Sequence, residues 1–260
     1  MIFISDLDKT LIFSKKHLPT TNDLYIAENK DKIPCSFIEK RTFDNLKKFS
    51  EDNIFIPATA RTKEQYERIH IFNHLNTKYS IICNGKSILI DGQIDENWEN
   101  LMNDKISKLP RQITPLFEEI TEFSKKELPE TEMKYYCYDN YLAMISFPKK
   151  EDLTVNFINN LNLLIKDSGW YAFACGRKLY ISTSFINKKF ALQYIKENLL
   201  KSKEKIVASG DSLYDLEMLE FSDYPIIPKH GEIANKLKTT INSTFDGSYE
   251  ISEYILELAK

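Results

Sequence analysis

Short apolar runs alternate with amphipathic patterns along much of the chain, and this alternation predicts strands followed by helices. Each run has the length of a strand and is rich in Ile, Val or Phe, as expected for parallel strands covered on both faces. The runs lie at 2–5, 54–58, 80–83, 205–209 and 224–227. The helical patterns lie at 39–51, 63–75, 188–200, 213–221, 232–238 and 249–258. We therefore expect an α/β fold with a doubly wound, Rossmann-like parallel sheet.

The pattern changes between about residues 88 and 180. It opens with a predicted hairpin over 87–94, which has Asp91-Gly92 at its turn. Helical patterns near 113–126 and 153–166 then alternate with strand patterns at 134–147 and 170–182. Strands with two helices, placed inside an otherwise regular alternation, predict an inserted α+β domain. The expected division is a core domain of 1–86 and 182–260 and an inserted domain of 87–181.

The segment between the first strand and the first helix has two interpretations. Asp23–Glu28 and Lys32–Ile38 could pair as a small hairpin over the exit of the first strand. The alternative is a long surface loop.

Composition and charge narrow the class of protein. Of the 260 residues, 42% are hydrophobic and 28% charged, which is typical of a soluble globular protein. A net charge of -3 leaves no basic surplus for a nucleic-acid partner. No apolar run reaches the roughly 18–20 residues that span a bilayer, and the N-terminus lacks a signal-peptide pattern. Four widely spaced cysteines without a C-x-x-C pair fit a reducing compartment, so we expect a cytoplasmic protein without a membrane partner.

The first strand ends in a sequence with unusual electrostatics, Asp6-Leu7-Asp8-Lys9-Thr10. Two carboxylates this close repel each other, and they lose hydration at the end of a buried strand. The arrangement is costly unless a cation or a shared proton offsets it. It therefore indicates an active site.

Other predicted strands also end in polar side chains. Thr59 and Arg61 follow the strand at 54–58, and Asp211 and Asp215 follow the one at 205–209. Lys188 lies at the start of a predicted helix. Because ligands bind beyond the carboxyl ends of strands in open α/β sheets, these residues are expected to meet in one site.

In these motifs the chain resembles the haloacid dehalogenase superfamily. The superfamily's D-x-D-x-[TV], Ser/Thr, Lys and G-D-x-x-x-D motifs occur in order, at Asp6, Thr59, Lys188 and Asp211. The inserted domain resembles the large α+β cap of the Cof-type, sucrose-phosphatase and mannosyl-phosphoglycerate-phosphatase branches. Cys83-Asn84-Gly85 and 188–192 resemble that branch's N-G and K-x-x-A-L elements, and the latter alignment selects Lys188 over Lys189.

The resemblance implies a role for each acidic residue. Asp6 would be the nucleophile of phosphoryl transfer, forming an aspartyl-phosphate. Mg²⁺ would be bound by Asp6, Asp211 and the backbone carbonyl of Asp8. Asp8 would protonate the leaving alcohol and later activate water, and repulsion from Asp6 favours its protonated form. Asp215 is expected to orient its neighbours rather than to bind the metal.

The remaining residues would bind the substrate. Thr59 would donate to a phosphate oxygen, and Lys188 would neutralise charge on Asp6 and the phosphate. The other residues expected to contact phosphate or substrate are Thr10, Arg61, Asn84 and Gly85. Two positions depart from the family pattern: Lys9 replaces a frequent Gly, and Tyr214 replaces an Asn found in many Cof-like members.

The expected function is Mg²⁺-dependent hydrolysis of a small phosphate ester, with a sugar phosphate favoured. A phosphosugar mutase and a non-catalytic sensor of a phosphate ligand are the alternatives, because both could use this fold. The identity of the substrate and the oligomeric state do not follow from the sequence.

Several weaker signals have competing interpretations. His70 and His74 could share a metal, but without a third ligand surface histidines are favoured. Tyr135, Tyr136, Tyr138 and Tyr141 could line a sugar pocket, although packing of the inserted domain is the commoner reason for such a stripe. Arg177-Lys178 could hold a second anionic group or form a solvated turn, and 229–231 could border the site or only lead into a helix.

Overall fold

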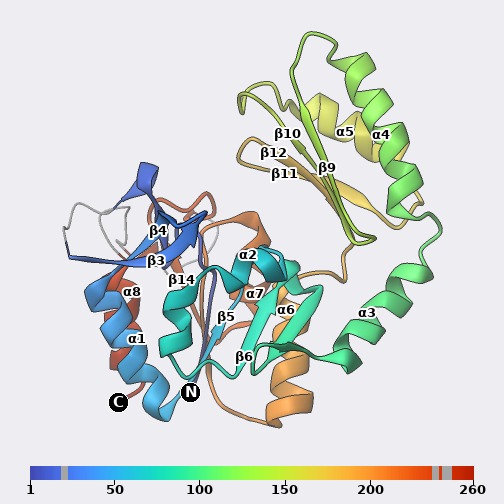
Figure 1. The fold of residues 1–260 in the computed structure, drawn as a ribbon. Helices are drawn as coiled ribbons and strands as arrows, with labels where there is room; N and C mark the ends of the chain where they lie inside the picture. Colours follow the sequence, from blue (N-terminus) through green and yellow to red (C-terminus); the bar gives the residue numbers. More distant parts are fainter. Residues whose placement is uncertain (19–22, 236–239, 242–247) are drawn as a thin grey trace. The chain divides into compact units, whose positions relative to one another are not determined.

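A computed structural model describes residues 1–18, 23–235, 240–241 and 248–260 of the chain (Figure 1). It divides into two compact units, of which the first comprises Met1–Glu96 and Asn187–Lys260 and the second Asn97–Ile186. These boundaries lie 10 and 5 residues beyond the expected ones at 86 and 181. The first difference arises because the hairpin of 87–94 pairs with the strand before it, in the first unit.

The first unit is built on a parallel five-stranded sheet, which confirms the predicted α/β class. Its strand order is β15-β14-β13-β1-β5. Every neighbouring pair is parallel. The strands are β1 (Ile2–Ser5), β5 (Ile54–Pro57), β13 (Ile206–Ser209), β14 (Tyr224–Pro228) and β15 (Thr240–Ile241). The central strands β1 and β13 are buried throughout, as their continuous apolar sequences predict.

A second, antiparallel sheet continues beyond β5. It consists of β6 (Tyr79–Ile82), β7 (Ser87–Ile90) and β8 (Gln93–Ile94), and Asp91-Gly92 forms the predicted turn between the last two. A single bridge between Ala58 and Ile81 links this sheet to the end of β5. The side chains that follow β5 and β6 are therefore neighbours.

Helices cover the parallel sheet. α1 (Lys40–Asp52) and α8 (Tyr249–Leu258) pack against each other, and their apolar side chains share a core with Phe3 and Phe55. Those two rings are opposite one another in the register of β1 and β5 and stack at 5.6 Å. α6 (Lys188–Tyr194) and α7 (Leu216–Phe221) lie on the other side of the sheet (Figure 1).

Four predicted helices differ from the observed ones, and the one at 213–221 is a 3₁₀ turn (Leu213–Asp215) followed by α7. The one at 63–75 is α2 (Lys63–Glu67) followed by a 3₁₀ turn (His70–His74), because the chain bends at Ile69 (φ -82°, ψ 75°) to bury apolar side chains. The helix at 188–200 continues beyond α6 as a π-helical turn (Ile195–Leu200). Residues 232–235 form a turn rather than a helix, and 236–238 lie outside the described residues.

The segment after β1 forms a hairpin, the first of its two interpretations, rather than a loop. Its strands β3 (Leu24–Lys30) and β4 (Ile33–Glu39) are antiparallel, and the short β2 (Phe13–Ser14) pairs with β4. A 3₁₀ turn (Lys15–His17) follows β2.

The second unit is a four-stranded antiparallel sheet with helices on one face. The strand order is β11-β12-β10-β9. The strands are β9 (Lys134–Tyr138), β10 (Leu142–Ser146), β11 (Tyr171–Cys175) and β12 (Lys178–Ser182), and the helices are α4 (Ile113–Glu127) and α5 (Val155–Leu164). The single strand predicted at 134–147 is thus a hairpin, which turns at Asp139 with φ 44°. α3 (Glu96–Ser107) was not predicted.

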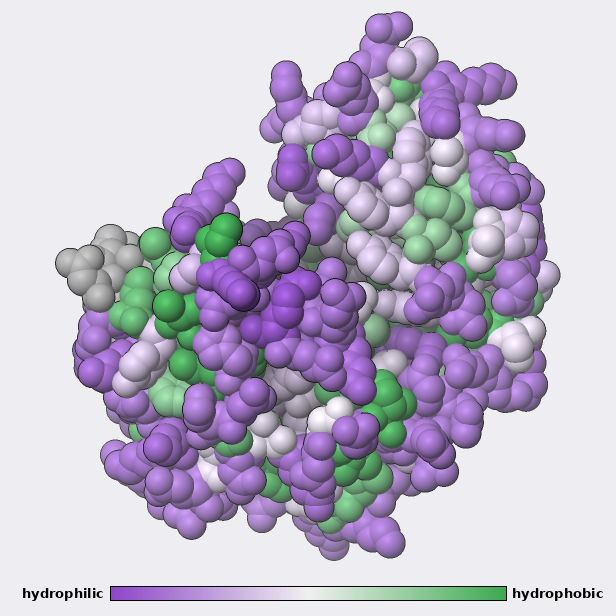
Figure 2. Space-filling model, viewed as in Figure 1, coloured by the Kyte–Doolittle hydropathy of each residue, from purple (hydrophilic) through white to green (hydrophobic). Residues whose placement is uncertain are grey.

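The sheet of the second unit has one core face and one aromatic face. Alternate residues such as Ala143 and Ile181 face the core with α4 and α5. The aromatic face, defined by Tyr136, Tyr138, Tyr171, Phe173 and Tyr180, carries stacked ring pairs at 5.4–6.4 Å. Figure 2 shows pale and green areas over these strands, whereas most of the visible surface of both units is purple.

Within the described part of the chain, no helix is long and apolar enough to cross a membrane.

Candidate active site

The register of the parallel sheet brings the first and fourth motifs together. Ser5 and Ser209 are opposite each other at the ends of β1 and β13, and their hydroxyls lie 2.7 Å apart. The backbone N–H of Asp6 donates to the carbonyl of Ser209 at 2.9 Å. Asp6 and Asp211 therefore leave adjacent strands side by side.

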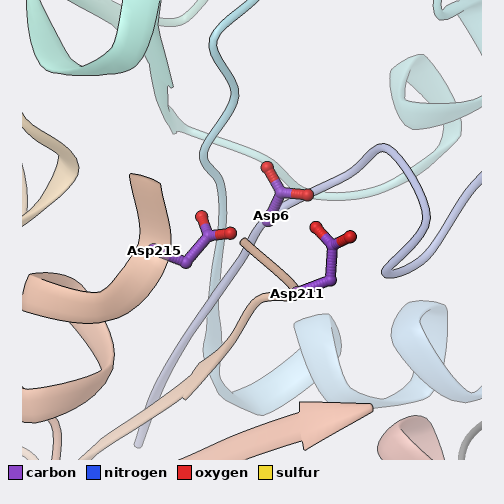
Figure 3. Close-up of side chains that lie close together, drawn as sticks. All are labelled: Asp6, Asp211 and Asp215. Carbon is purple, nitrogen blue, oxygen red and sulfur yellow. The ribbon is translucent and has the colours of Figure 1, made fainter. Parts of the chain in front are cut away.

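Three carboxylates converge at this edge of the sheet. Figure 3 shows the side chains of Asp6, Asp211 and Asp215 turned toward a common space, and one oxygen of each lies within 4.8 Å of the others. All three residues are buried. Asp215 reaches the group from a 3₁₀ turn (Leu213–Asp215) that begins after Asp211. A side chain at Gly210 would collide with Asp215, since a Cβ there would lie 2.4 Å from the Asp215 Cβ.

Lys188 supplies the positive charge of this centre. Its side chain is 1% exposed, and its Nζ donates to Asp6 Oδ1 at 2.5 Å and to Asp215 Oδ1 at 2.6 Å. The neighbouring Lys189 lies over the ring of Phe190 instead. The structure therefore brings Lys188, and not Lys189, to the acidic motifs.

Gly85 sets the position of the helix that carries Lys188. A Cβ at Gly85 would lie 2.2 Å from the carbonyl oxygen of Asn187, and the residue has φ +94°. Asn187 is the N-cap of α6, because its side chain accepts from the N–H of Phe190 at 2.9 Å. Only glycine allows this approach, which explains a glycine in the N-G element.

Two threonines complete the buried centre. Thr10 donates to Asp6 Oδ2 at 3.3 Å. Thr59 is 1% exposed, and its backbone bonds to Ile81 and Asn84 tie the ends of β5 and β6 together. Asn84, also buried, adopts a left-handed conformation (φ 55°) beside Gly85. The structure thus gathers Thr10, Thr59, Asn84 and Gly85 around one edge of the sheet.

The charges of the centre do not balance. Burial, followed by repulsion between the carboxylates, raises the pKa of Asp211 to about 8. Burial likewise raises the pKa of Asp6 to about 7, although Lys188 opposes the shift. Burial alone would lower the pKa of Lys188, but Asp215 and Asp6 outweigh it and raise that pKa. The centre is therefore short of positive charge, which fits a divalent cation.

The donor set agrees with a hard cation. All three acids offer oxygen ligands, as Mg²⁺ prefers. Asp215 is the most engaged: Lys188 occupies Oδ1, while the N–H and hydroxyl of Ser212 donate to Oδ2. Asp6 and Asp211 thus have more capacity left for a metal than Asp215 does.

The side chain of Asp8 lies apart from the three acids, paired with Arg61. The guanidinium donates to both Asp8 oxygens, each at 2.8 Å, and its Nη1 donates to Glu28 at 2.8 Å. Arg61, which the sequence assigned to phosphate or substrate binding, is therefore held between two carboxylates. Arg68 and Ser36 also donate to Glu28, and the donors together hold the pKa of this buried carboxyl below its usual value.

Glu28 is the residue of this region that sequence reasoning missed. It lies in the predicted hairpin, 33 positions before Arg61 in the chain. A buried glutamate on a strand of mixed composition carries no sequence motif, so only the fold could reveal it.

The loop after Asp8 tolerates a lysine where much of the family has glycine. Lys9 has φ 66°, and this left-handed conformation is held by its N–H, which donates to Ile12 O at 2.8 Å. His230 Nε2 donates to the Lys9 carbonyl at 2.6 Å. The segment 229–231 therefore borders the loop of the first motif.

The weaker candidates are dispersed. His70 and His74 lie in a 3₁₀ turn, and in the described parts of the chain the only cluster able to hold a metal is the three aspartates. Tyr135 packs on the core face of the second unit, whereas Tyr136 and Tyr138 belong to the aromatic face. Arg177 is exposed and donates to Pro148 O at 3.5 Å.

Comparison with known families gives this site its context. The model of the sucrose-6F-phosphate phosphohydrolase family matches residues 1–230. The chain belongs to this family. Its members are phosphoric monoester hydrolases of the haloacid dehalogenase superfamily, in the branch with a cap domain that the motifs had indicated. A search of curated proteins found no match.

Solved structures share the fold over the whole chain. The sucrose-phosphatase of Synechocystis, determined with sucrose and phosphate, has a TM-score of 0.69 at 16% identity and covers 100% of this chain and 98% of its own. A Thermotoga maritima protein has a TM-score of 0.62 at 19% identity, covering 99% and 96%. A haloalkanoate-superfamily phosphatase of Bacteroides thetaiotaomicron has a TM-score of 0.60 at 15% identity, covering 99% and 94%.

Proposed function

We propose that this member of the sucrose-phosphate phosphohydrolase family is an Mg²⁺-dependent phosphatase of a small sugar phosphate, acting through an aspartyl-phosphate on Asp6. The observation that carries the proposal is the buried contact of Asp6 with Lys188, beside Asp211. Lys188 holds one oxygen of Asp6 and Thr10 contacts the other, so the nucleophile is fixed before substrate arrives.

Mg²⁺ would be held by carboxylate oxygens of Asp6 and Asp211 and by the backbone carbonyl of Asp8. When bound, it would offset the negative charge of the carboxylates and the phosphate. Asp215 would orient Lys188 rather than bind the metal, because its oxygens already accept from Lys188 and Ser212.

The residues divide the reaction into two displacements. A carboxylate oxygen of Asp6 attacks phosphorus, the ester P–O bond breaks, and Asp8 gives its proton to the departing alcohol oxygen. In the second step Asp8 takes a proton from water, whose oxygen attacks the phosphorus of the aspartyl-phosphate. Asp6 leaves as a carboxylate, and inorganic phosphate is released.

Residues around the edge of the sheet would bind the transferred group. The hydroxyl of Thr59, the backbone at Asn84 and Gly85, and Thr10 would donate to phosphate oxygens. Lys188 would balance the charge that builds up as Asp6 approaches phosphorus. Arg61 would act on the transferred phosphoryl group through Asp8, to which it donates two hydrogen bonds.

A sugar as the organic part of the ester rests on two observations. The family model is that of a sucrose-phosphate phosphohydrolase, and a similar structure was determined with sucrose and phosphate.

The test is turnover with Mg²⁺ across a panel of phosphorylated sugars and a generic aryl phosphate, for the wild type and Asp6→Asn. We expect Mg²⁺-dependent release of phosphate by the wild type and none by the variant. Turnover by Asp6→Asn would contradict the mechanism. In ¹⁸O-labelled water, a hydrolase places solvent oxygen in the free phosphate, whereas a mutase releases little phosphate and a sensor releases none.

A further inference from the structure

We propose that Glu28 is a positioning residue for Asp8 and acts through Arg61. This inference rests on the proposed function, in which Asp8 protonates the leaving group. It assigns a role in phosphoryl transfer to the hairpin of β3 and β4, which contains none of the four motifs.

The contacts form a continuous chain from the hairpin to Asp8. Glu28 Oε2 accepts from Arg61 Nη1 at 2.8 Å, and Arg61 Nε and Nη2 donate to the two oxygens of Asp8, each at 2.8 Å. One edge of the planar guanidinium thus faces Asp8 while Nη1 is held by Glu28. Because the group is rigid, fixing Nη1 fixes the direction of the two bonds to Asp8.

Glu28 itself is held from several sides. Its side chain is only 4% exposed, whereas that of Asp8 is 52% exposed. Ser36 donates to the same oxygen as Arg61 at 2.9 Å, and Arg68 donates to Oε1 at 3.0 Å. An exposed carboxylate such as that of Asp8 has many conformations in water. Of the linked side chains, the buried Glu28 is therefore the one that can hold Asp8, through Arg61, in a single conformation.

Two irregularities in the pairing of the hairpin determine the direction of the Glu28 side chain. The pairing of β3 with β4 is regular up to Ile26–Phe37, passes over Ala27, pairs Glu28 with Ser36, and then passes over Cys35. Glu28 thus lies between two irregularities, one on each strand. As a result the consecutive residues Ala27 and Glu28 are both buried, which a regular alternating strand would not allow.

Stability alone does not account for this arrangement. Burying a carboxylate with its cationic partners costs desolvation that their attraction offsets only in good geometry, and an apolar pair would serve the core as well. The cluster instead contains two carboxylates and two guanidiniums, and one of the carboxylates is the proposed acid. Holding Asp8 in place is therefore a reason for burying the charged side chain of Glu28.

The experiment compares two aryl esters that differ in their need for an acid. p-Nitrophenolate is a good leaving group and needs no proton, whereas phenolate leaves more readily when it is protonated. Displacement of Asp8 should therefore slow the hydrolysis of phenyl phosphate more than that of p-nitrophenyl phosphate. For Glu28→Gln with Mg²⁺ we expect the ratio of kcat/KM for the nitrophenyl ester to that for the phenyl ester to rise about tenfold. kcat/KM is used because it reports the steps up to formation of the aspartyl-phosphate.

Glu39→Gln is the matched control. Glu39 is a buried carboxylate of the same hairpin, but it accepts from the N–H groups of Ser248 and Tyr249 and has a structural role. We expect this variant to melt at a lower temperature and to keep the wild-type ratio. Ser36→Ala removes one donor to Glu28, and we expect a smaller rise in the ratio, so the idea stays testable if Glu28→Gln does not fold.

A second comparison asks whether the effect passes through Asp8. In an Asp8→Asn background, Glu28→Gln should change the ratio no further. A ratio in Glu28→Gln that stays at the wild-type value while melting falls as in Glu39→Gln would overturn the positioning role. If the wild type releases no phosphate with Mg²⁺ from either ester or from any of the phosphorylated sugars, the proposed function fails instead, so the two failures are distinguishable.

Discussion

Carboxylates in two buried groups of the first unit have pKa values that are shifted in opposite directions. In the group of Asp6, Asp211 and Asp215, burial and mutual repulsion raise the pKa values of Asp6 and Asp211, and Lys188 only partly opposes the shift. In the second group, around Glu28, burial again favours a higher pKa, but hydrogen bonds from Arg61 and Arg68 outweigh it and lower the pKa. The balance between direct donors and neighbouring carboxylates thus decides the direction of the shift.

The first group can therefore accept a charged ligand, whereas the charges of the second group are already neutralised. The first group keeps an excess of negative charge, so a metal and a phosphate can enter together. The second group has its counterions built in, so it can orient Arg61 without attracting a ligand.

The largest expected effect comes from removing the cation of the first group. Lys188→Met leaves two buried carboxylates, Asp6 and Asp215, without their partner, and we expect kcat/KM for an aryl phosphate to fall by about 10³-fold. Steady-state kinetics with Mg²⁺ measures the loss. Lys189→Met is the control, because this lysine lies over Phe190, and it should retain wild-type turnover. Equal losses in both variants would contradict the assignment of Lys188.

A smaller effect is expected from moving Lys188 without removing it. Gly85→Ala places a methyl group against the Asn187 carbonyl and strains the backbone at φ +94°, so we expect about 3 kcal/mol less stability together with lower activity. Denaturant unfolding measures the first effect. Gly92→Ala has a similar φ of +77° but open space around the new Cβ, so it should cost about 1 kcal/mol and leave activity intact. Similar losses in the two variants would show that the contact with Asn187 is unimportant.

The smallest effect concerns pH and the metal. Because the pKa values of Asp6 and Asp211 are raised to about 7 and about 8 from 3.8, the metal-free folded state binds protons more tightly than the unfolded chain. Their contribution to stability is complete below about pH 4 and is lost as the pH rises through 7 and 8. We expect the melting temperature in EDTA to fall as the pH rises across this range.

Mg²⁺ should reverse this trend, since it replaces the protons on these carboxylates. The increase in melting temperature on adding Mg²⁺ should therefore grow between pH 6 and pH 8.5, measured by thermal shift. Asp211→Asn removes one raised carboxyl and should flatten both pH profiles. An Mg²⁺ effect independent of pH in the wild type would argue against metal binding at these residues.

The sequence predicted most of the first group because its parts lie at strand ends. Asp6 and Asp211 follow apolar runs that could only be buried strands, and parallel pairing forces such ends together. The choice of Lys188 over Lys189 came from a resemblance, and the contacts with Asp6 and Asp215 now give a physical reason. The α/β class followed from the same alternation of patterns.

The second group could not be predicted, because it depends on tertiary register. The hairpin was one of two interpretations of this segment, and the irregularities beside Glu28 are not visible in its composition. The break at Ile69 in the helix predicted over 63–75 has a similar origin, since burial of Ile71 and Phe72 overrides a continuous helical pattern. The strand at 80–83 and the hairpin of 87–94 were both recognised, but their antiparallel pairing was not, because the strand was expected in the parallel sheet.

The paired irregularities of the hairpin also show where its length can change. Ala27 is the extra residue on β3 and Cys35 the extra residue on β4, and the pairing resumes at Asn29–Pro34. Deleting Ala27 alone would join Ile26 directly to Glu28 and remove the irregularity on β3, and the pairings on either side could all be kept. Deleting Cys35 alone would do the same on β4. The hairpin can therefore lose either extra residue without a change in its turn between Lys30 and Ile33.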